Sequence, residues 1–297
     1  MSYTTSVKET LCHKSSDLCC KRAELYGFLL FSGTFSREKI IFRSDNSFVI
    51  KRYEDIFRSL DFDAYELTEK QNKTVSYFVE VSEENTDELI KKIGDVSVGP
   101  PLRIDYSAFE NECCAAAFLR GVFIGGGFIC SPDKSYHLEI RTGHQMLADD
   151  LIRFCEEYDI HLKSVMRNGI RILYIKTSEQ IKDVLAYIGA STSVFDFVNA
   201  ELEKSLKNNV NRVVNCEQAN IEKSINAAQN QIKIINKLKK KGYPNMSPDL
   251  IKLAEIRLEN PEMTLEELGK QLDPVLSKSG VAHRMKKITD MTKKKVK

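Results

Sequence analysis

Hydrophobic and polar positions repeat along the first two thirds of the chain. Two strongly apolar segments, 94 residues apart, each follow a pair of adjacent cysteines and carry two glycines at the same spacing. Self-similarity at a fixed offset is typical of a duplicated structural unit. The matching residues are Cys19-Cys20, Gly27 and Gly33 in the first segment and Cys113-Cys114, Gly121 and Gly127 in the second.

Both segments are apolar nearly all round, which predicts buried helices. Gly27 and Gly121 lie inside them, where a glycine costs about 1 kcal/mol relative to alanine. Close approach of the two backbones would compensate for that cost. We therefore expect the two helices to cross at these glycines and to join two similar subdomains.

The same order of elements is expected after each apolar helix, from alternating and helical spacings. In the first copy these elements are a strand at Lys39–Arg43, a helix at Phe48–Leu60, strands at Asp63–Thr68 and Thr74–Val81 around a turn at Asn72, and a helix at Thr86–Ile93. In the second they are strands at Phe128–Cys130 and Tyr136–Arg141, a helix at Gln145–Tyr158, a hairpin of His161–Arg167 and Ile170–Lys176 around Asn168-Gly169, and a helix at Glu179–Ile188. Because the two copies match, we expect both to be αββαββα, the first in residues 1–95 and the second in 96–199.

The last third of the chain has helical spacing only. A polar segment at 200–215 predicts a helical linker, and residues 216–297 predict an all-α domain. Its expected helices are Ala219–Lys241, with an apolar stripe of Ile225, Ile232, Ile235 and Leu238; Ser247–Asn260, which buries Leu250, Leu253, Ala254 and Leu258; a helix that buries Leu265, Leu268 and Leu272; and Lys278–Met291. Thr264 and Glu267 match a capping box, Asp273-Pro274 marks a turn, and Ser277 is the expected cap of the last helix. The chain is therefore predicted to be an α+β protein that ends in a helix-turn-helix.

Helix geometry separates the faces of the last helix. Val281, Met285 and Ile288 share one face and should enter the core. At 100° per residue, Ser279, His283 and Lys286 lie on the opposite face, which makes them candidates for base edges in a major groove. The candidates for phosphate contact are Arg284 and Lys287 on the flanks, Lys278 and Gly280 in the first turn beside the cap Ser277, and the basic tail from Lys293. The alternative is a surface helix with solvated lysines.

Charge favours a polyanion partner for the C-terminal domain. Residues 216–297 hold 17 lysines and arginines against 10 acidic residues, a net charge of +7, whereas the rest of the chain has a net charge of −5. Double-stranded DNA is the expected partner, although lysines also serve to keep a surface soluble. The sequence has no apolar run of the roughly 20 residues that a membrane helix needs and no apolar signal core. We therefore expect no membrane contact and a cytoplasmic, nucleoid-associated protein.

The eight cysteines indicate reduced thiols that pack as small apolar groups. They form no CxxC pair, the usual zinc signature, and neither a metal nor a cofactor is expected. His137 and His144 have no third ligand at a helical or hairpin spacing and are expected to be structural or surface residues. The acidic pair Asp149-Asp150 is expected on a solvated helix face.

The glycine-bearing helices carry a family resemblance. Leu25–Gly33 (LYGFLLFSG) and Leu119–Gly127 (LRGVFIGGG) resemble the signature helices of LAGLIDADG homing endonucleases. The run AAFLRGVFIGGGFICSPDKSYHLEI is closer still to the WhiA family of bacterial regulators, and this resemblance covers essentially the whole chain. It implies a degenerate homing-endonuclease domain joined to a helix-turn-helix. It also implies a transcription regulator that acts in cell division, chromosome segregation or sporulation.

The resemblance bears on catalysis as well. Active LAGLIDADG enzymes hold their metals on an acid one place before the final glycine of each motif, and the corresponding residues here are Ser32 and Gly126. Neither side chain supplies the negative charge that a divalent metal needs. No signature places the nearby acids Glu24, Asp133 or Glu139 at the helix ends. We therefore expect no catalytic residue and no enzyme activity.

Three functions remain open at this point. The first is a sequence-specific DNA-binding regulator, and the second is a nuclease, which Ser32 and Gly126 disfavour. The third is an architectural protein whose acidic N-terminal domain docks a protein partner, such as RNA polymerase or another regulator. In the linker, Asn211, Arg212 and Asn215 resemble polar positions of the WhiA family and are candidates for DNA-backbone contact, with a solvated helix face as the alternative.

Overall fold

A computed structural model describes residues 2–71 and 75–291. The expected turn at Asn72, the first residue of the strand expected from Thr74, and the basic tail from Lys293 lie outside the described residues. The chain divides into two compact units, Met1–Glu203 and Lys204–Lys297. Among the described residues, no helix is both long enough and apolar enough to pass through a membrane.

The first repeat forms the elements that its pattern predicts, with shifted bounds, together with a short strand, β1, for which no residue range was predicted. They are α2 (Leu18–Ser32), β1 (Gly33–Phe35), β2 (Ile40–Ser44), α3 (Ser47–Ser59), β3 (Glu66–Gln71), β4 (Val75–Val81) and α4 (Glu83–Lys92). The strands form an antiparallel sheet in the order β1-β2-β4-β3. A further helix, α1 (Tyr3–Cys12), precedes the repeat and was not expected.

The second repeat has the same order of elements. After a short 3-10 turn, η1 (Tyr106–Ala108), come α5 (Glu112–Gly126), β5 (Gly127–Ile129), β6 (Leu138–Thr142), α6 (Gln145–Glu156), β7 (Lys163–Arg167), β8 (Ile170–Ile175) and α7 (Ser178–Ile188). Its sheet order, β5-β6-β8-β7, matches the first. Asn168 and Gly169 both have positive φ, as a two-residue hairpin turn requires. The duplicated αββαββα architecture is therefore confirmed.

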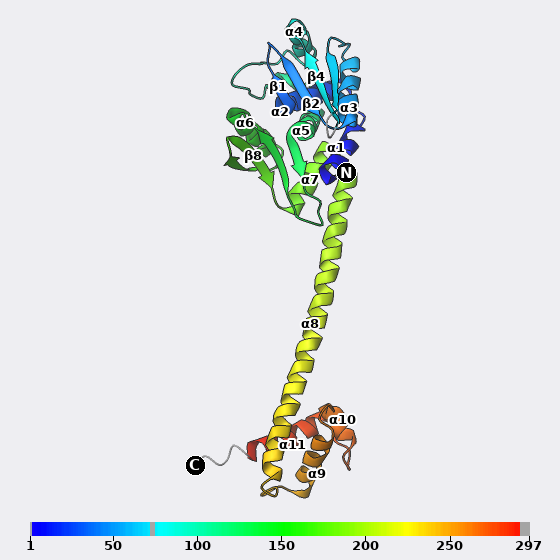
Figure 1. Ribbon diagram of the computed structural model, residues 1–297, viewed down its shortest axis with the longest axis vertical. Coiled ribbons are helices and arrows are strands. Elements are labelled where there is room, and N and C mark those ends of the chain that lie inside the picture. Colours follow the sequence, from blue (N-terminus) through cyan, green and yellow to red (C-terminus); the bar gives the residue numbers. More distant parts are fainter. Residues whose placement is uncertain (1, 72–74, 292–297) are drawn as a thin grey trace. The chain divides into compact units, whose positions relative to one another are not determined.

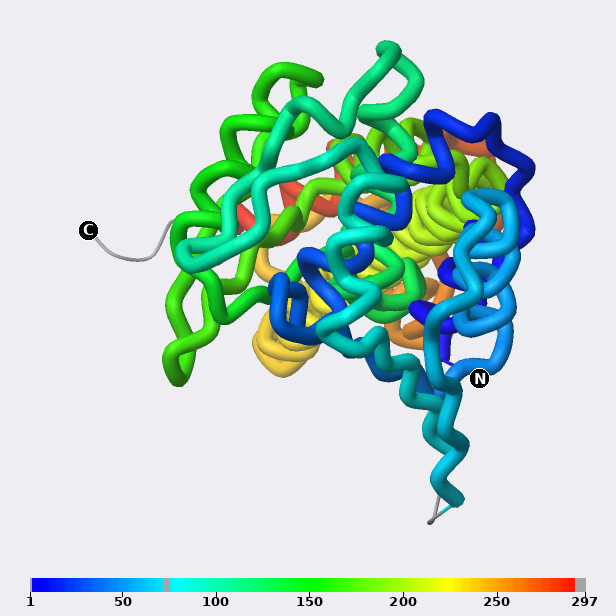
Figure 2. Tube along the Cα trace, turned by 90° about the horizontal axis from the view of Figure 1, so that it is seen from above, coloured from blue at the N-terminus to red at the C-terminus, as the bar shows by residue number. Residues whose placement is uncertain are grey.

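Helices α2 and α5 lie side by side at the junction of the two repeats, as Figures 1 and 2 show. A methyl group on Gly27 would lie 2.3 Å from the carbonyl oxygen of Phe118, and one on Gly121 would lie 1.9 Å from that of Glu24. The two backbones thus touch at both glycines, which confirms the expected crossing. The helices run in the same direction, because Gly125 near the end of α5 contacts Phe31 and Ser32 near the end of α2.

The C-terminal unit is entirely helical. Its core joins the end of α8 (Ser191–Lys239) to α9 (Pro248–Glu259), α10 (Leu265–Lys270) and α11 (Lys278–Met291). The predicted linker helix and the helix expected at Ala219–Lys241 are continuous within α8. Ile235 and Leu238 are buried as predicted. Ile225 is 52% exposed, so the prediction that it belongs to the buried apolar stripe is wrong. The reason is that α9–α11 pack only on the last turns of α8.

Asp150 also departs from expectation. Its side chain is 9% exposed and accepts hydrogen bonds from Arg103 at 2.5 and 2.8 Å, from Arg153 at 2.7 Å and from the Ile104 amide at 3.2 Å. Burial alone would raise the pKa of Asp150, but the hydrogen bonds from the two arginines outweigh it and lower that pKa. Asp150 therefore anchors the segment before η1, while only Asp149 lies on the solvated face.

Candidate nucleic-acid interface

The helix-turn-helix begins at a capping box that the sequence predicts and the structure confirms. The Glu267 amide donates to Thr264 Oγ1 at 3.3 Å, and the Thr264 amide donates to Glu267 Oε2 at 2.8 Å. Each bond satisfies a donor that a helix start leaves without a partner. The box fixes where α10 begins, while Leu268 and Leu272 bury its inner face.

The turn after α10 depends on Gly269, a residue that the sequence analysis did not single out. Its carbonyl accepts a hydrogen bond from the Leu276 amide at 3.1 Å. A methyl group at Gly269 would lie 2.2 Å from the Leu276 carbonyl oxygen and 3.2 Å from a methyl of Val281. The glycine therefore lets the turn and α11 pack directly against α10. A glycine near the end of a short helix before a Pro-containing turn is the signal that could have identified it.

The last helix, α11, is oriented by its buried face. Val281, Met285 and Ile288 are at most 2% exposed and belong to the core of the unit, as predicted. Ser277 caps the helix, since the Gly280 amide donates to its Oγ at 3.3 Å and the Val281 amide to its carbonyl at 3.0 Å. Five candidate side chains of this helix are exposed, three opposite the core, one in the first turn and one on the flank: Ser279, His283, Lys286, Lys278 and Lys287.

Two candidate phosphate contacts are engaged inside the unit. Arg284 is half-buried and lies 3.7 Å from the carboxylate of Asp249 on α9. The Gly280 amide donates to the Ser277 cap at 3.3 Å, and the expected phosphate contact at Gly280 stays a prediction. In contrast, Ala282 lies on the exposed face beside Ser279 and Lys286, and sequence reasoning missed it. Its position one residue after the core residue Val281 is the signal that places it there.

The linker candidates Asn211, Arg212 and Asn215 all lie on α8 with exposed side chains. Asn215 precedes the core residue Ile235 by 20 positions, which is roughly 30 Å along a helix. The structure thus places the linker candidates well apart from the packed part of the C-terminal unit.

The two compact units differ more in net charge than the two parts of the chain divided at residue 216. Residues 1–203 hold 24 basic and 32 acidic residues, a net charge of −8, whereas residues 204–297 hold 20 and 10, a net charge of +10. The stretch 204–215 contributes three basic and no acidic residues. A net positive charge of this size attracts polyanions by long-range forces.

The ends of α2 and α5 carry the two degenerate positions. Ser32 is the last residue of α2, and its Oγ is buried with no hydrogen-bond partner among the described residues. Gly126 is the last residue of α5, and a methyl group there would lie 3.0 Å from the Arg141 carbonyl oxygen and 3.3 Å from Phe31 Cβ. A longer acidic side chain at either position would need the packing to open.

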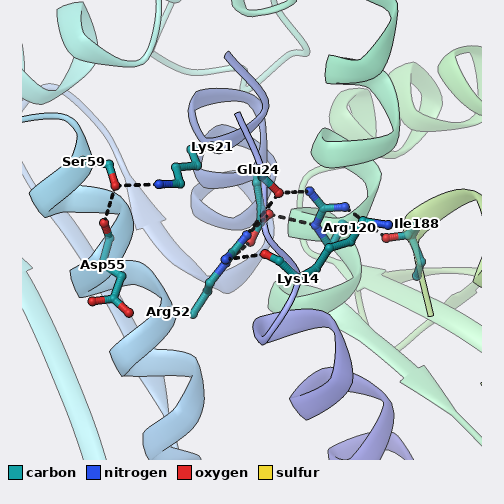
Figure 3. A network of polar contacts seen from close by, with 9 residues as sticks. Lys14, Lys21, Glu24, Arg52, Asp55, Ser59, Arg120 and Ile188 are labelled. Atoms are coloured by element: carbon teal, nitrogen blue, oxygen red, sulfur yellow. Dashed lines mark hydrogen bonds and ion pairs between the residues drawn. The ribbon is translucent and has the colours of Figure 1, made fainter. Parts of the chain in front are cut away.

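The acidic residues near these helix ends form hydrogen bonds with other side chains of the protein. Glu24 is fully buried in α2, where Arg52 donates to both of its oxygens at 2.8 Å and Arg120 donates to Oε2 at 2.8 Å (Figure 3). Glu139 is held by His137 at 2.8 Å and by Arg141. Burial would raise the pKa of Glu139, but the bonds from His137 and Arg141 lower it overall. Asp133 is exposed in the loop after β5, where Ser131 donates to it.

Comparison with known proteins covers both units. Residues 210–292 match the WhiA C-terminal HTH domain, and residues 115–207 match the WhiA LAGLIDADG-like domain. The chain is 35% identical to the "Probable cell division protein WhiA" of Ruminiclostridium cellulolyticum, over 99% of this chain and 98% of that protein. It is also 35% identical to the protein of the same name from Carboxydothermus hydrogenoformans, over 97% and 96% of the two chains.

A solved structure supports the same assignment. The crystal structure of full-length DUF199/WhiA from Thermatoga maritima aligns with 99% of this chain and 98% of that chain, at 25% identity and a TM-score of 0.61. The two relatives and this structure agree with the chain along nearly its full length, and the two domain matches cover residues 115–207 and 210–292. The chain therefore belongs to the WhiA family of cell division proteins, with a LAGLIDADG-like domain and a C-terminal helix-turn-helix domain.

Proposed function

We propose that this protein is a sequence-specific DNA-binding transcription regulator of the WhiA type that reads double-stranded DNA through α10 and α11. It acts in cell division, chromosome segregation or sporulation. Its location is cytoplasmic, in association with the nucleoid. The observation that carries the proposal is the orientation of α11. Three buried residues fix one face of this helix in the core, so that the polar face opposite is presented rigidly to a partner.

Four side chains on that face have the chemistry for reading bases. In a major groove, lysine donates to the acceptors of guanine, and serine can bond to any base. Alanine contacts the methyl group of thymine. We assign base reading to Ser279, His283 and Lys286, and add Ala282, which lies between them on the exposed face.

Phosphate contacts are assigned to the flanks of α11. Lys278 and Lys287 are exposed at its first turn and on its side, where the backbone of a bound duplex would pass. Arg284 can join them only by leaving Asp249, from which it is 3.7 Å away. Each phosphate neutralised contributes about 0.9 to the slope of log affinity against log salt concentration. The net charge of +10 in this unit supports a strong dependence of binding on salt.

The LAGLIDADG-like unit is proposed to have no nuclease activity. Cleavage of a phosphodiester needs carboxylates that hold a divalent metal, whereas the motif ends here are Ser32 and Gly126 and the acid Glu24 is bound by two arginines. Purified protein should leave supercoiled and cognate duplex DNA intact in magnesium or manganese. Metal-dependent cleavage that persists on re-purification, and is lost in a point variant of a nearby acid, would refute this.

A protein partner for the N-terminal unit is the second proposal. The net charge of −8 disfavours a phosphate-binding surface there and favours a protein with a basic face, such as RNA polymerase or another regulator. Cross-linking of full-length protein in cells should then place its protein contacts in residues 1–203. Cross-links that join those residues chiefly to DNA would count against this second proposal.

The DNA proposal is tested by selecting binding sites from randomised DNA. Lys286→Ala and His283→Ala should each cost about 1–3 kcal/mol on the preferred site and relax one or two base pairs of the selected motif. Lys287→Ala should keep the motif, weaken binding to all duplexes alike, and lower the salt slope by about 0.9. Lys252→Ala, which removes the same charge from the exposed face of α9, is the matched control.

The outcomes separate the alternatives. An unchanged motif in the Lys286 and His283 variants, with a changed motif in Arg284→Ala, would mean that α11 presents a different face to the bases. If none of these variants affected binding, the proposal that DNA is read by the helix-turn-helix would be refuted. Arg212→Ala should leave the selected motif intact, because its position on α8 is roughly 35 Å from the core residue Ile235.

A further inference from the structure

Four thiols meet where α2 and α5 begin. The Sγ atoms of Cys19, Cys20, Cys113 and Cys114 all lie within 4.8 Å of one another. All four are free thiols, and neither pair has the CxxC spacing of a zinc motif. The sequence analysis treats the cysteines one by one, as small apolar groups, and the structure brings these four together. We call these four residues the cysteine cluster.

The cluster results from the duplication. Cys19 and Cys20 each have a counterpart 94 residues later, and the two helices run side by side in the same direction. The equivalent pairs therefore meet at one end of the helix pair, with two thiols from each helix. Cys20 and Cys114 are buried, Cys19 is half-buried and Cys113 is exposed, so the cluster reaches the surface on one side.

We infer that the cysteine cluster is a binding site for a single zinc ion, held by four thiolates, that joins the two repeats. Zinc in structural sites is tetrahedral, with Zn–S distances of about 2.3 Å. Four such bonds place the sulfurs about 3.8 Å apart, which fits a set whose members all lie within 4.8 Å. An iron–sulfur cluster would put several irons and sulfides between the cysteines and would need a wider set of thiols.

The surroundings favour thiolates at this place. Both cysteine pairs occupy the first turn of a helix, where the helix dipole stabilises negative charge. A divalent cation would compensate the negative charge of four neighbouring thiolates.

Arg22 adds a second, independent observation. It follows Cys19 by three positions on α2, so that both side chains project from the same side of the helix. Its Nε is buried and has no hydrogen-bond partner within the described part of the chain, while its Nη1 binds Glu110 at 2.5 Å. A buried donor without an acceptor costs free energy, and a zinc-bound thiolate is an acceptor of the required charge.

The test uses full-length protein purified without a histidine tag and under reducing conditions. Elemental analysis should find one zinc per chain, and replacement by cobalt should give the absorption of a tetrahedral tetrathiolate site. The double variant Cys19→Ser/Cys113→Ser should bind neither ion. The control Cys130→Ser/Cys216→Ser, which removes two thiols outside the cluster, should bind one of either. A chelator should lower the melting temperature of wild type and control only.

Two results would overturn the inference. One is reduced, folded wild-type protein that contains no zinc and takes up neither zinc nor cobalt. The other is a disulfide between α2 and α5 in protein isolated under reducing conditions, found by peptide mass mapping. If the double variant does not fold, Cys113→Ser alone replaces the most exposed ligand. In that variant, the thiolate-to-cobalt absorption should fall by about one quarter, since one thiolate in four is lost.

Discussion

Gly121→Ala tests the crossing of the two repeats with a single added methyl group. In an ordinary helix this change stabilises by about 0.8–1.0 kcal/mol, because alanine is the better helix former. Here the new Cβ would lie 1.9 Å from the Glu24 carbonyl oxygen and 2.8 Å from the Phe28 amide nitrogen. Both neighbours are backbone atoms of α2, so no side chain can rotate away. The clash therefore makes Gly121→Ala destabilising, despite the gain in helix propensity.

The magnitude follows from the shift that the contact demands. An ordinary contact begins near 3.4 Å, so the helices must separate by about 1.5 Å at this point. Overpacking of a close-packed core costs about 1–3 kcal/mol, and a backbone-to-backbone clash belongs at the upper end. After the gain in helix propensity, we expect a net loss of about 2 kcal/mol. For a unit of about 200 residues this lowers the melting temperature by about 4–8 °C.

Differential scanning calorimetry is the suitable assay, because the chain contains no tryptophan whose fluorescence would report unfolding. Gly143→Ala is the matched control. This glycine lies in the same repeat, and a methyl group there would meet nothing within 4 Å. The control should melt within about 2 °C of wild type. A Gly121→Ala protein that melts at or above the wild-type temperature would show that α2 and α5 do not touch at this residue.

Three other changes have definite expected outcomes. Glu24→Gln leaves two buried arginines with one neutral partner and should destabilise by about 3–5 kcal/mol, measured by denaturant unfolding against the exposed control Glu84→Gln; equal stability would refute the buried pair. Burial lowers the pKa of Lys8 to about 8, below its unfolded value of about 10.4. Folded protein thus binds fewer protons between these pH values, and its stability should rise with pH there. Lys8→Met should be more stable at pH 7 by about 1–3 kcal/mol, and this advantage should shrink above pH 8; a constant difference would contradict the reasoning. Gly269→Ala should lower the melting temperature of the C-terminal unit and weaken DNA binding, because its methyl group would lie 2.2 Å from Leu276; melting as in wild type would place the turn elsewhere.

Local pattern was sufficient for much of the fold. Spacing and caps identified α11 and its buried face, since Val281, Met285 and Ile288 obey a rule that depends only on helix geometry. The Thr264 capping box likewise needs only residues within one turn. The helix crossing could be predicted because Gly27 and Gly121 recur at one offset.

Contacts between distant residues were not accessible in this way. Asp150 is buried because Arg103, 47 residues earlier, binds it, and no local pattern records that partner. The cysteine cluster needs the parallel pairing of α2 and α5 before its members can meet. Ile225 shows the opposite error: it has the right spacing for a core position, but no packed helix reaches that far along α8.

The buried pair of Glu24 and Arg120 has a consequence for synthesis of the chain. The two residues are 96 positions apart, and ribosomes add about 5–20 residues per second. Roughly 5–20 s therefore pass between translation of the acid and of its second arginine. During that interval α2 has been made but the helix that covers it has not. The nascent first repeat consequently exposes apolar surface that α5 later covers, which makes it prone to aggregation, and a product truncated before α5 lacks these contacts.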